Sequence, residues 1–172
     1  MSNIYLIGFM GTGKSAVGKQ LQKFLPFVFV DMDEAIARVE CMSIPEIFEK
    51  KGEEGFRDAE TALLKILSKQ DNQIISCGGG VVLRDENIDI MRKTGTVVRL
   101  TSRPELVYER INRNNLRPLA KGKSLEEIKE MMDSREKQYQ KAAHFTVESS
   151  EEPVDVVVSE IVRSLALADR LN

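Results

Sequence analysis

The chain has 172 residues, a length that suits one domain with its own core, and we predict a single domain over 1–172. Its 25 lysines and arginines are balanced by 27 aspartates and glutamates, which gives a formal net charge of −2. A protein that binds nucleic acid needs an excess of clustered cations, so we expect no nucleic-acid partner.

Cysteine and histidine are scarce in the chain. Two cysteines and one histidine are too few for a disulfide framework or for a zinc site built on several histidines. The apolar runs, such as 25–30, are far shorter than the roughly 18 residues of a membrane span. We therefore expect a cytoplasmic protein with reduced cysteines and no membrane partner, and we expect it to be a monomer.

Short apolar runs alternate with helical stretches along the chain. The first run, 4–7, leads into a glycine-rich turn and then a helix from Lys14, which is predicted to continue to Pro26. Another helix is predicted to open at Ser102. Further strands are predicted at 27–30, 74–77, 96–100 and 144–147, and further helices over 32–70 (with breaks near 43 and 52), 85–93, 124–142 and from 154 onward.

Strands that alternate with helices pair in parallel and carry helices on both faces of the sheet. The predicted fold is therefore a three-layer α/β domain. Ligands bind at the carboxyl ends of the strands in such sheets, so the residues that follow each strand are the first candidates for a site.

The residues after the first strand match the phosphate-binding pattern G-x-x-x-x-G-K-[ST] over Gly8–Ser15. Glycines let backbone N–H groups converge on phosphate oxygens, and the helix that follows points its positive end at the same place. Lys14 is expected to reach the β- and γ-phosphates, and the Ser15 hydroxyl to bind Mg²⁺. The position of this loop, after a strand and before a helix, supports the match.

Two carboxylates and three glycines follow the next strands. Asp31 ends the second strand, where a magnesium-facing acid is expected, and Asp33 lies two residues further on. Alternatively, one of the two aspartates simply caps the following helix. Gly78–Gly80 follow the third strand, where they would let a ligand approach the backbone, or form a tight turn.

These segments, with three further features, resemble the shikimate kinases in order and spacing. The matching features are GFMGTGKS (8–15), DMD (31–33), FR (56–57), GGG (78–80), RPL (117–119) and Arg135. The resemblance extends from Ile4 to the final helix, and the combination is far more specific than a phosphate-binding loop alone. It implies a P-loop kinase fold with a five-stranded parallel sheet in the order 2-3-1-4-5. It also implies transfer of the γ-phosphoryl group of ATP to the 3-hydroxyl of shikimate, a step toward chorismate and the aromatic amino acids.

The resemblance further implies how the substrate is held. Asp33 would bind the reacting hydroxyl and act as a base, while Arg57 and Arg135 would grip the shikimate carboxylate. Gly79 and Gly80 would offer backbone N–H groups to the substrate. Planar guanidinium groups suit this task because each can donate two parallel hydrogen bonds to a carboxylate. The segment 33–61 would form the substrate-binding part of the domain.

The nucleotide would be held by the first loop and by three later residues. Gly11, Thr12, Gly13, Lys14, Ser15 and Ala16 would hold the phosphates of ATP, and Ser15 and Asp31 would hold Mg²⁺. Arg110 would stack on the adenine, and Pro153 would close over it. Arg117 would swing onto the phosphates from a lid loop over 112–123, and would act in catalysis with Lys14 and Asp33. The sequence departs from the family at Glu148, where an aspartate is usual, near the loop expected to close over the adenine.

Other functions remain open from the residues alone. A related small-molecule kinase could act on gluconate or on a nucleoside monophosphate, although the proline usual in the adenylate kinase loop is absent between Gly8 and Gly13. A GTPase is disfavoured because the chain has no N-K-x-D motif. A nucleotide-binding protein without catalysis is disfavoured because Lys14, Asp33 and Arg117 are all present.

Overall fold

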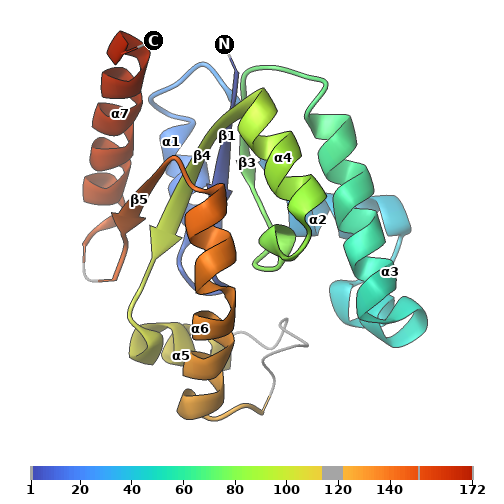
Figure 1. Cartoon of the computed structure of the whole chain (residues 1–172). Coiled ribbons are helices and arrows are strands. Elements are labelled where there is room, and N and C mark those ends of the chain that lie inside the picture. Colours follow the sequence, from blue (N-terminus) through green and yellow to red (C-terminus); the bar gives the residue numbers. More distant parts are fainter. Residues whose placement is uncertain (1, 114–121, 151, 172) are drawn as a thin grey trace.

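Five parallel strands form one sheet in the order β2-β3-β1-β4-β5 (Figure 1). The structure is a computed structural model that describes residues 2–113, 122–150 and 152–171. The strands are β1 (Asn3–Ile7), β2 (Val28–Asp31), β3 (Gln73–Ser76), β4 (Gly95–Thr101) and β5 (Phe145–Glu148). The predicted fold class and strand order are both confirmed.

Helices connect successive strands and cover both faces of the sheet, as parallel pairing requires (Figure 1). They are α1 (Lys14–Leu21), α2 (Met32–Glu40), α3 (Ile44–Leu67), the 3₁₀ turn η1 (Val81–Leu83), α4 (Asp85–Thr94), α5 (Pro104–Asn112), α6 (Leu125–Ala142) and α7 (Val154–Leu171). Within the described ranges, none of these helices is long and apolar enough to cross a membrane.

The central strand β1 shows how the core is divided between the two faces. Tyr5 and Ile7 belong to the core cluster that includes residues of α3, α4 and α6. Ile4 and Leu6, which point to the opposite face, belong to the cluster with residues of α1 and α7. β1 is therefore buried on both faces, and its carboxyl end is fixed by packing from either side.

Two local predictions are wrong. Helix α1 ends at Leu21, well before Pro26, because the chain tightens there through a bond from Phe24 N–H to the Leu21 carbonyl. Phe24 is consequently 59% exposed and does not join the core. Ser102 does not cap α5, which begins after Arg103; instead the backbone N–H of Arg103 donates to the hydroxyl of Ser150 at 2.7 Å.

Helix α3 is bent at Gly52, where the backbone adopts φ 70° and ψ −177°. This combination is essentially restricted to glycine, because a Cβ atom would be strained there. The part before the bend packs with α2 through Ile36 and Ile47, and the part after it carries Arg57, whose guanidinium lies against Gly80 after β3. The break predicted near Gly52 is thus a bend that aims the second part of α3.

Replacing Gly52 with alanine should lower the free energy of unfolding by about 1–3 kcal/mol, because the alanine would have to keep a strained backbone. Chemical denaturation of Gly52→Ala and the native protein measures the difference. Lys50→Ala, an exposed change two residues earlier in the same helix, is the control and should shift stability by less than about 0.5 kcal/mol. Equal stability of Gly52→Ala and the native protein would show that a Cβ atom meets no strain at this bend.

Candidate functional site

The loop between β1 and α1 has a shape that depends on glycine. Gly8 has φ +143°, and a Cβ atom there would lie 2.3 Å from the backbone oxygen of Leu100. Gly13, with φ +91°, precedes α1 and provides no side-chain cap for that helix. The first N–H groups of a helix lack partners within the helix, so the start of α1 is suited to an anion.

Lys14 folds back over the loop that precedes it. Its Nζ donates to the carbonyl oxygens of Gly8 at 2.8 Å and Phe9 at 2.9 Å, and the residue is 8% exposed. The ammonium group is therefore placed at the concave side of the loop, where the sequence pattern puts the phosphates.

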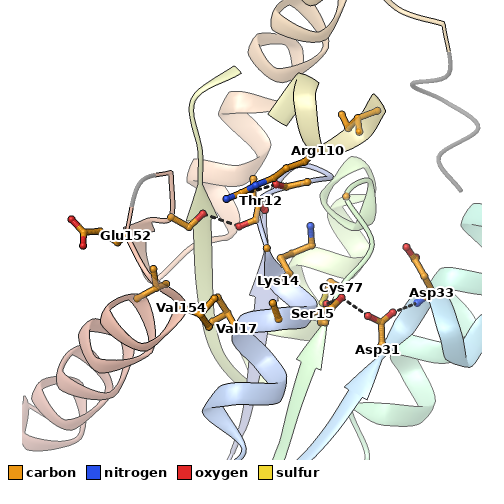
Figure 2. Close-up of a pocket in the computed structure, with 18 residues that line it drawn as sticks. Thr12, Lys14, Ser15, Val17, Asp31, Asp33, Cys77, Arg110, Glu152 and Val154 are labelled. Atoms are coloured by element: carbon orange, nitrogen blue, oxygen red, sulfur yellow. Dashed lines mark hydrogen bonds between the residues drawn. The ribbon is translucent and has the colours of Figure 1, made fainter. Parts of the chain in front are cut away.

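Asp31 has two tasks at the end of β2. Its Oδ2 accepts a hydrogen bond from Ser15 Oγ at 2.5 Å, and its Oδ1 accepts from the backbone N–H of Asp33 at 3.1 Å (Figure 2). The same Oδ1 also accepts from the backbone N–H of Glu34 at 3.3 Å. Asp31 is thus the cap of α2, as one interpretation of the sequence had it, and it also contacts the serine of the phosphate-binding loop. The two roles are compatible because they use different oxygens.

Asp33 lies in the first turn of α2 and approaches the glycine triplet after β3. Its Oδ1 is 3.1 Å from the point where a Cβ atom on Gly78 would lie, and Oε1 of Glu60 is 2.5 Å from the same point. Glycine at position 78 therefore leaves room for two carboxylates. Glu60 was not singled out from the sequence, although it lies one turn after Arg57 on α3.

Arg57 and Glu60 form a buried ion pair. Nη1 of Arg57 donates to Oε2 of Glu60 at 2.9 Å, and the two residues are 5% and 0% exposed. Burial raises the pKa of the Glu60 carboxyl, and the positive charge of Arg57 opposes that shift. The Cζ, Nη1 and Nη2 atoms of Arg57 lie within 2.4 Å of where a Cβ atom on Gly80 would be, so the guanidinium rests directly on the glycine backbone.

Arg135 reaches the same triplet from α6. Its Nη1 donates to the carbonyl oxygen of Gly79 at 3.3 Å, and its guanidinium lies over the ring of Phe9, 5.4 Å from the ring centre. Arg57 and Arg135 are distant in sequence, yet they meet Gly80 and Gly79 respectively. The structure therefore brings together the two arginines and the two glycines that the sequence comparison assigned to the substrate.

A cavity of about 470 Å³ lies beside this cluster, at the carboxyl ends of the strands (Figure 2). Its lining contains most of the predicted nucleotide, metal and substrate residues: Gly11, Thr12, Gly13, Lys14, Ser15, Ala16, Asp31, Asp33, Gly79 and Arg110. Over the described part of the chain, that lining leaves out Arg57, Gly80, Arg135 and Pro153. Gly79 lines the cavity and also accepts the hydrogen bond from Arg135, so it joins the cavity to the arginine cluster.

The far side of the cavity is formed by α5 and by the loop before α7. Arg110 donates from Nη1 to the carbonyl oxygen of Gly11 at 2.9 Å, which holds its side chain against the loop. Ser149 donates to the carbonyl oxygen of Thr12 at 2.7 Å. No sequence pattern pointed to Ser149. Pro153 is exposed, while its neighbours Glu152 and Val154 line the cavity.

One predicted catalytic residue cannot be placed. Arg117, with most of the predicted lid loop over 112–123, lies outside the described residues.

The capping role of Asp31 can be separated from its charge. Asp31→Ala removes the cap of α2 and should lower the free energy of unfolding by about 1 kcal/mol, whereas Asp31→Asn should stay within a few tenths, because asparagine caps equally well. Thermal and urea unfolding of both variants measure this difference. Equal losses in the two variants would show that the charge facing Ser15, and not the cap, carries the stability.

Comparison with known proteins identifies one family. The family model described as "Shikimate kinase" matches residues 10–166. A shikimate kinase from Thermodesulfovibrio yellowstonii is 46% identical over 143 residues, which are 83% of each chain. A solved shikimate kinase from Acinetobacter baumannii, in complex with shikimate, superposes with a TM-score of 0.94 at 34% identity and covers 100% of this chain and 96% of its own. The solved shikimate kinase of Aquifex aeolicus gives a TM-score of 0.83 at 42% identity, with 99% of each chain covered.

Proposed function

Since the chain belongs to the shikimate kinase family, it is an ATP-dependent transferase of aromatic amino acid biosynthesis, and we propose a role in it for each residue of the site. The reaction moves the γ-phosphoryl group of ATP to the 3-hydroxyl of shikimate and yields 3-phosphoshikimate and ADP. The observation that carries the residue assignments is the meeting of Arg57, Arg135 and Asp33 at the glycine triplet, next to the phosphate-binding loop.

The arginine cluster binds the substrate carboxylate. Arg57 is already fixed by Glu60 and by its contact with Gly80, so little side-chain entropy is lost when an anion binds. Arg135 and the N–H groups of Gly79 and Gly80 complete the set of donors. Bound in this way at one end, shikimate presents its hydroxyls toward Asp33, which orients the 3-hydroxyl and accepts its proton.

The loop and the cavity bind ATP. Residues 11–16 surround the phosphates, Lys14 neutralises charge on them, and Arg110 packs along the adenine with Pro153 opposite. Arg117 completes the charge neutralisation from the lid. Phosphoryl transfer asks a protein mainly for positioning and charge stabilisation, and these residues supply both.

Ser15 and Asp31 are suited to Mg²⁺. Their side-chain oxygens lie 2.5 Å apart and are hard donors, the type that Mg²⁺ prefers. Mg²⁺ in proteins commonly keeps several waters and binds one or two side chains together with substrate phosphates, so a site with two protein oxygens fits it. When bound, the ion supplies neutralisation of the charge on the phosphates. We further propose that the enzyme acts as a monomer in the cytoplasm.

The activity is tested by ADP release with a panel of acceptors. Shikimate should stimulate ADP release far above the background hydrolysis of ATP, and gluconate and nucleoside monophosphates should not. Excess EDTA should stop the reaction, because the phosphates then lack their counter-ion. Stimulation by another acceptor equal to that by shikimate would contradict the assignment of the substrate.

Asp33→Asn should lower kcat by about 10²–10⁴-fold, because asparagine cannot accept the proton of the hydroxyl. The affinity for ATP, measured by calorimetry, should stay within about twofold of the native value, since Asp33 does not bind the nucleotide in this proposal. Glu34→Gln, an exposed change in the same turn of α2, is the matched control and should leave kcat unchanged. A kcat of Asp33→Asn above half the native value would exclude Asp33 as the base.

A further inference from the structure

The hydroxyl of Tyr139 is a buried hydrogen-bond donor that has no part in the chemistry described so far. Tyr139 lies on α6, is 2% exposed, and donates from Oη to the carbonyl oxygen of Gly79 at 2.5 Å. Burial raises the pKa of Tyr139 to about 12, and the neighbouring charge of Arg135 only partly opposes this. The group is therefore a neutral phenol at physiological pH, and its proton is available to the carbonyl.

The direction of the Gly79 carbonyl also fixes the direction of the Gly80 N–H, which belongs to the same peptide unit. The described residues contain no cis peptide bond, so the amide between Gly79 and Gly80 is planar and trans. In such an amide the C=O and N–H point in opposite directions. Holding the Gly79 oxygen toward Tyr139 therefore aims the N–H of Gly80 away from Tyr139.

Arg135 alone would be a poor holder of this carbonyl. Its hydrogen bond to the Gly79 oxygen is the longer one, at 3.3 Å against 2.5 Å for Tyr139. Arg135 is also the residue assigned to the substrate carboxylate, a stronger acceptor than a neutral carbonyl. When Arg135 turns its donors to the substrate, the Tyr139 hydroxyl still holds the peptide.

The ring of Tyr139 is itself fixed from the sheet. The guanidinium of Arg99, on β4, lies over the ring at 5.3 Å from its centre. Arg99 is held by two parallel bonds to Glu136, at 2.8 and 2.6 Å. Glu136 and Tyr139 lie on the same helix, so the ion pair of Arg99 with Glu136 holds the Tyr139 ring between α6 and the sheet.

We propose that Tyr139 is a positioning residue for the substrate carboxylate, which acts by holding the Gly79 carbonyl so that the Gly80 N–H is aimed at the anion. The proposal rests on the proposed function, because that function places the carboxylate at Gly79, Gly80 and the two arginines.

Tyr139→Phe tests the proposal because it removes the hydroxyl and keeps the ring. The KM for shikimate should rise by about fivefold to tenfold, the change expected for one lost hydrogen bond. The kcat and the KM for ATP should stay within twofold, since neither the base nor the nucleotide is touched. Steady-state kinetics with each substrate varied in turn measures all three.

Tyr5→Phe is the matched control. Tyr5 is also fully buried, in the same core cluster, and its hydroxyl bonds Thr94 at 2.7 Å, near the amino end of the sheet. Tyr5→Phe loses the bonds of its hydroxyl to Thr94 and Asn3, and Tyr139→Phe loses the bond to Gly79, so the control should lose at least as much thermal stability. Tyr5→Phe should nevertheless leave the KM for shikimate unchanged. A rise in the KM for shikimate in both variants would show that the Tyr139 effect comes from a general loss of core stability, and would overturn the proposal.

Arg57→Lys separates failure of the proposal from failure of the carboxylate assignment. If Arg57→Lys raises the KM for shikimate and Tyr139→Phe does not, the arginines bind the carboxylate as proposed and the role of Tyr139 is refuted. If neither variant raises the KM for shikimate, both the assignment of the arginines to the carboxylate and the role of Tyr139 are wrong. Should Tyr139→Phe melt far below Tyr5→Phe, Glu136→Gln provides the test instead. This change, at a side chain that is 43% exposed, weakens the hold on Arg99 and should raise the KM for shikimate by about two- to threefold; no rise would overturn the proposal.

Discussion

The parallel pairing of β1 with β3 on one side and β4 on the other is the constraint on which the site depends. In the register of the sheet, Leu6 of β1 lies opposite Ser76, the last residue of β3, so these two neighbouring strands end within one residue of each other. Strand β4 pairs with Leu6 through Val98 and continues to Thr101. The loop that begins at Gly8 and the triplet that begins at Gly78 are thereby brought into contact. A Cβ atom on Gly79 would lie 3.1 Å from the backbone nitrogen of Met10. The phosphate-binding loop and the glycine triplet therefore form one surface, which suits a reaction between two bound molecules.

The cations of this surface differ in what holds them. Lys14, Arg110 and Arg135 each donate to backbone carbonyls, which are neutral acceptors that an anionic ligand can replace or share. Arg57 is bound instead to the Glu60 carboxylate, and a buried charge of this kind is costly to leave unpaired. Arg57 must therefore keep Glu60 when substrate binds, while the other three can redirect their donors. The site combines one fixed cation with several adjustable ones.

The sequence was informative where neighbouring residues form a complete pattern, although the capping pattern at Ser102 is an exception. The phosphate-binding loop is a contiguous pattern, and so are the two pairs with capping-box spacing, Ser43 with Glu46 and Ser124 with Glu127; the structure forms the loop and both capping boxes. The meeting of Arg57 with Arg135 depends on the packing of α3 and α6 on one sheet face, and only the family resemblance anticipated it. Glu60 and Tyr139 could have been suspected, because each lies one helical turn after one of these arginines. Ser149, which reaches the loop through a hydroxyl, leaves no pattern in the sequence.

The glycine triplet shows what the sequence pattern left unspecified. From the sequence, Gly78–Gly80 could serve a tight turn or the approach of a ligand, and none of the three has the positive φ that favours glycine. Each is required for a different steric reason instead. Gly78 leaves room for the carboxylates of Glu60 and Asp33, Gly79 for the backbone of the phosphate loop, and Gly80 for the guanidinium of Arg57. A side chain at Gly78 or Gly80 would displace a charged group that is in place before any ligand arrives, and one at Gly79 would press on the backbone of the phosphate-binding loop. The triplet therefore follows from how the groups of the site are packed.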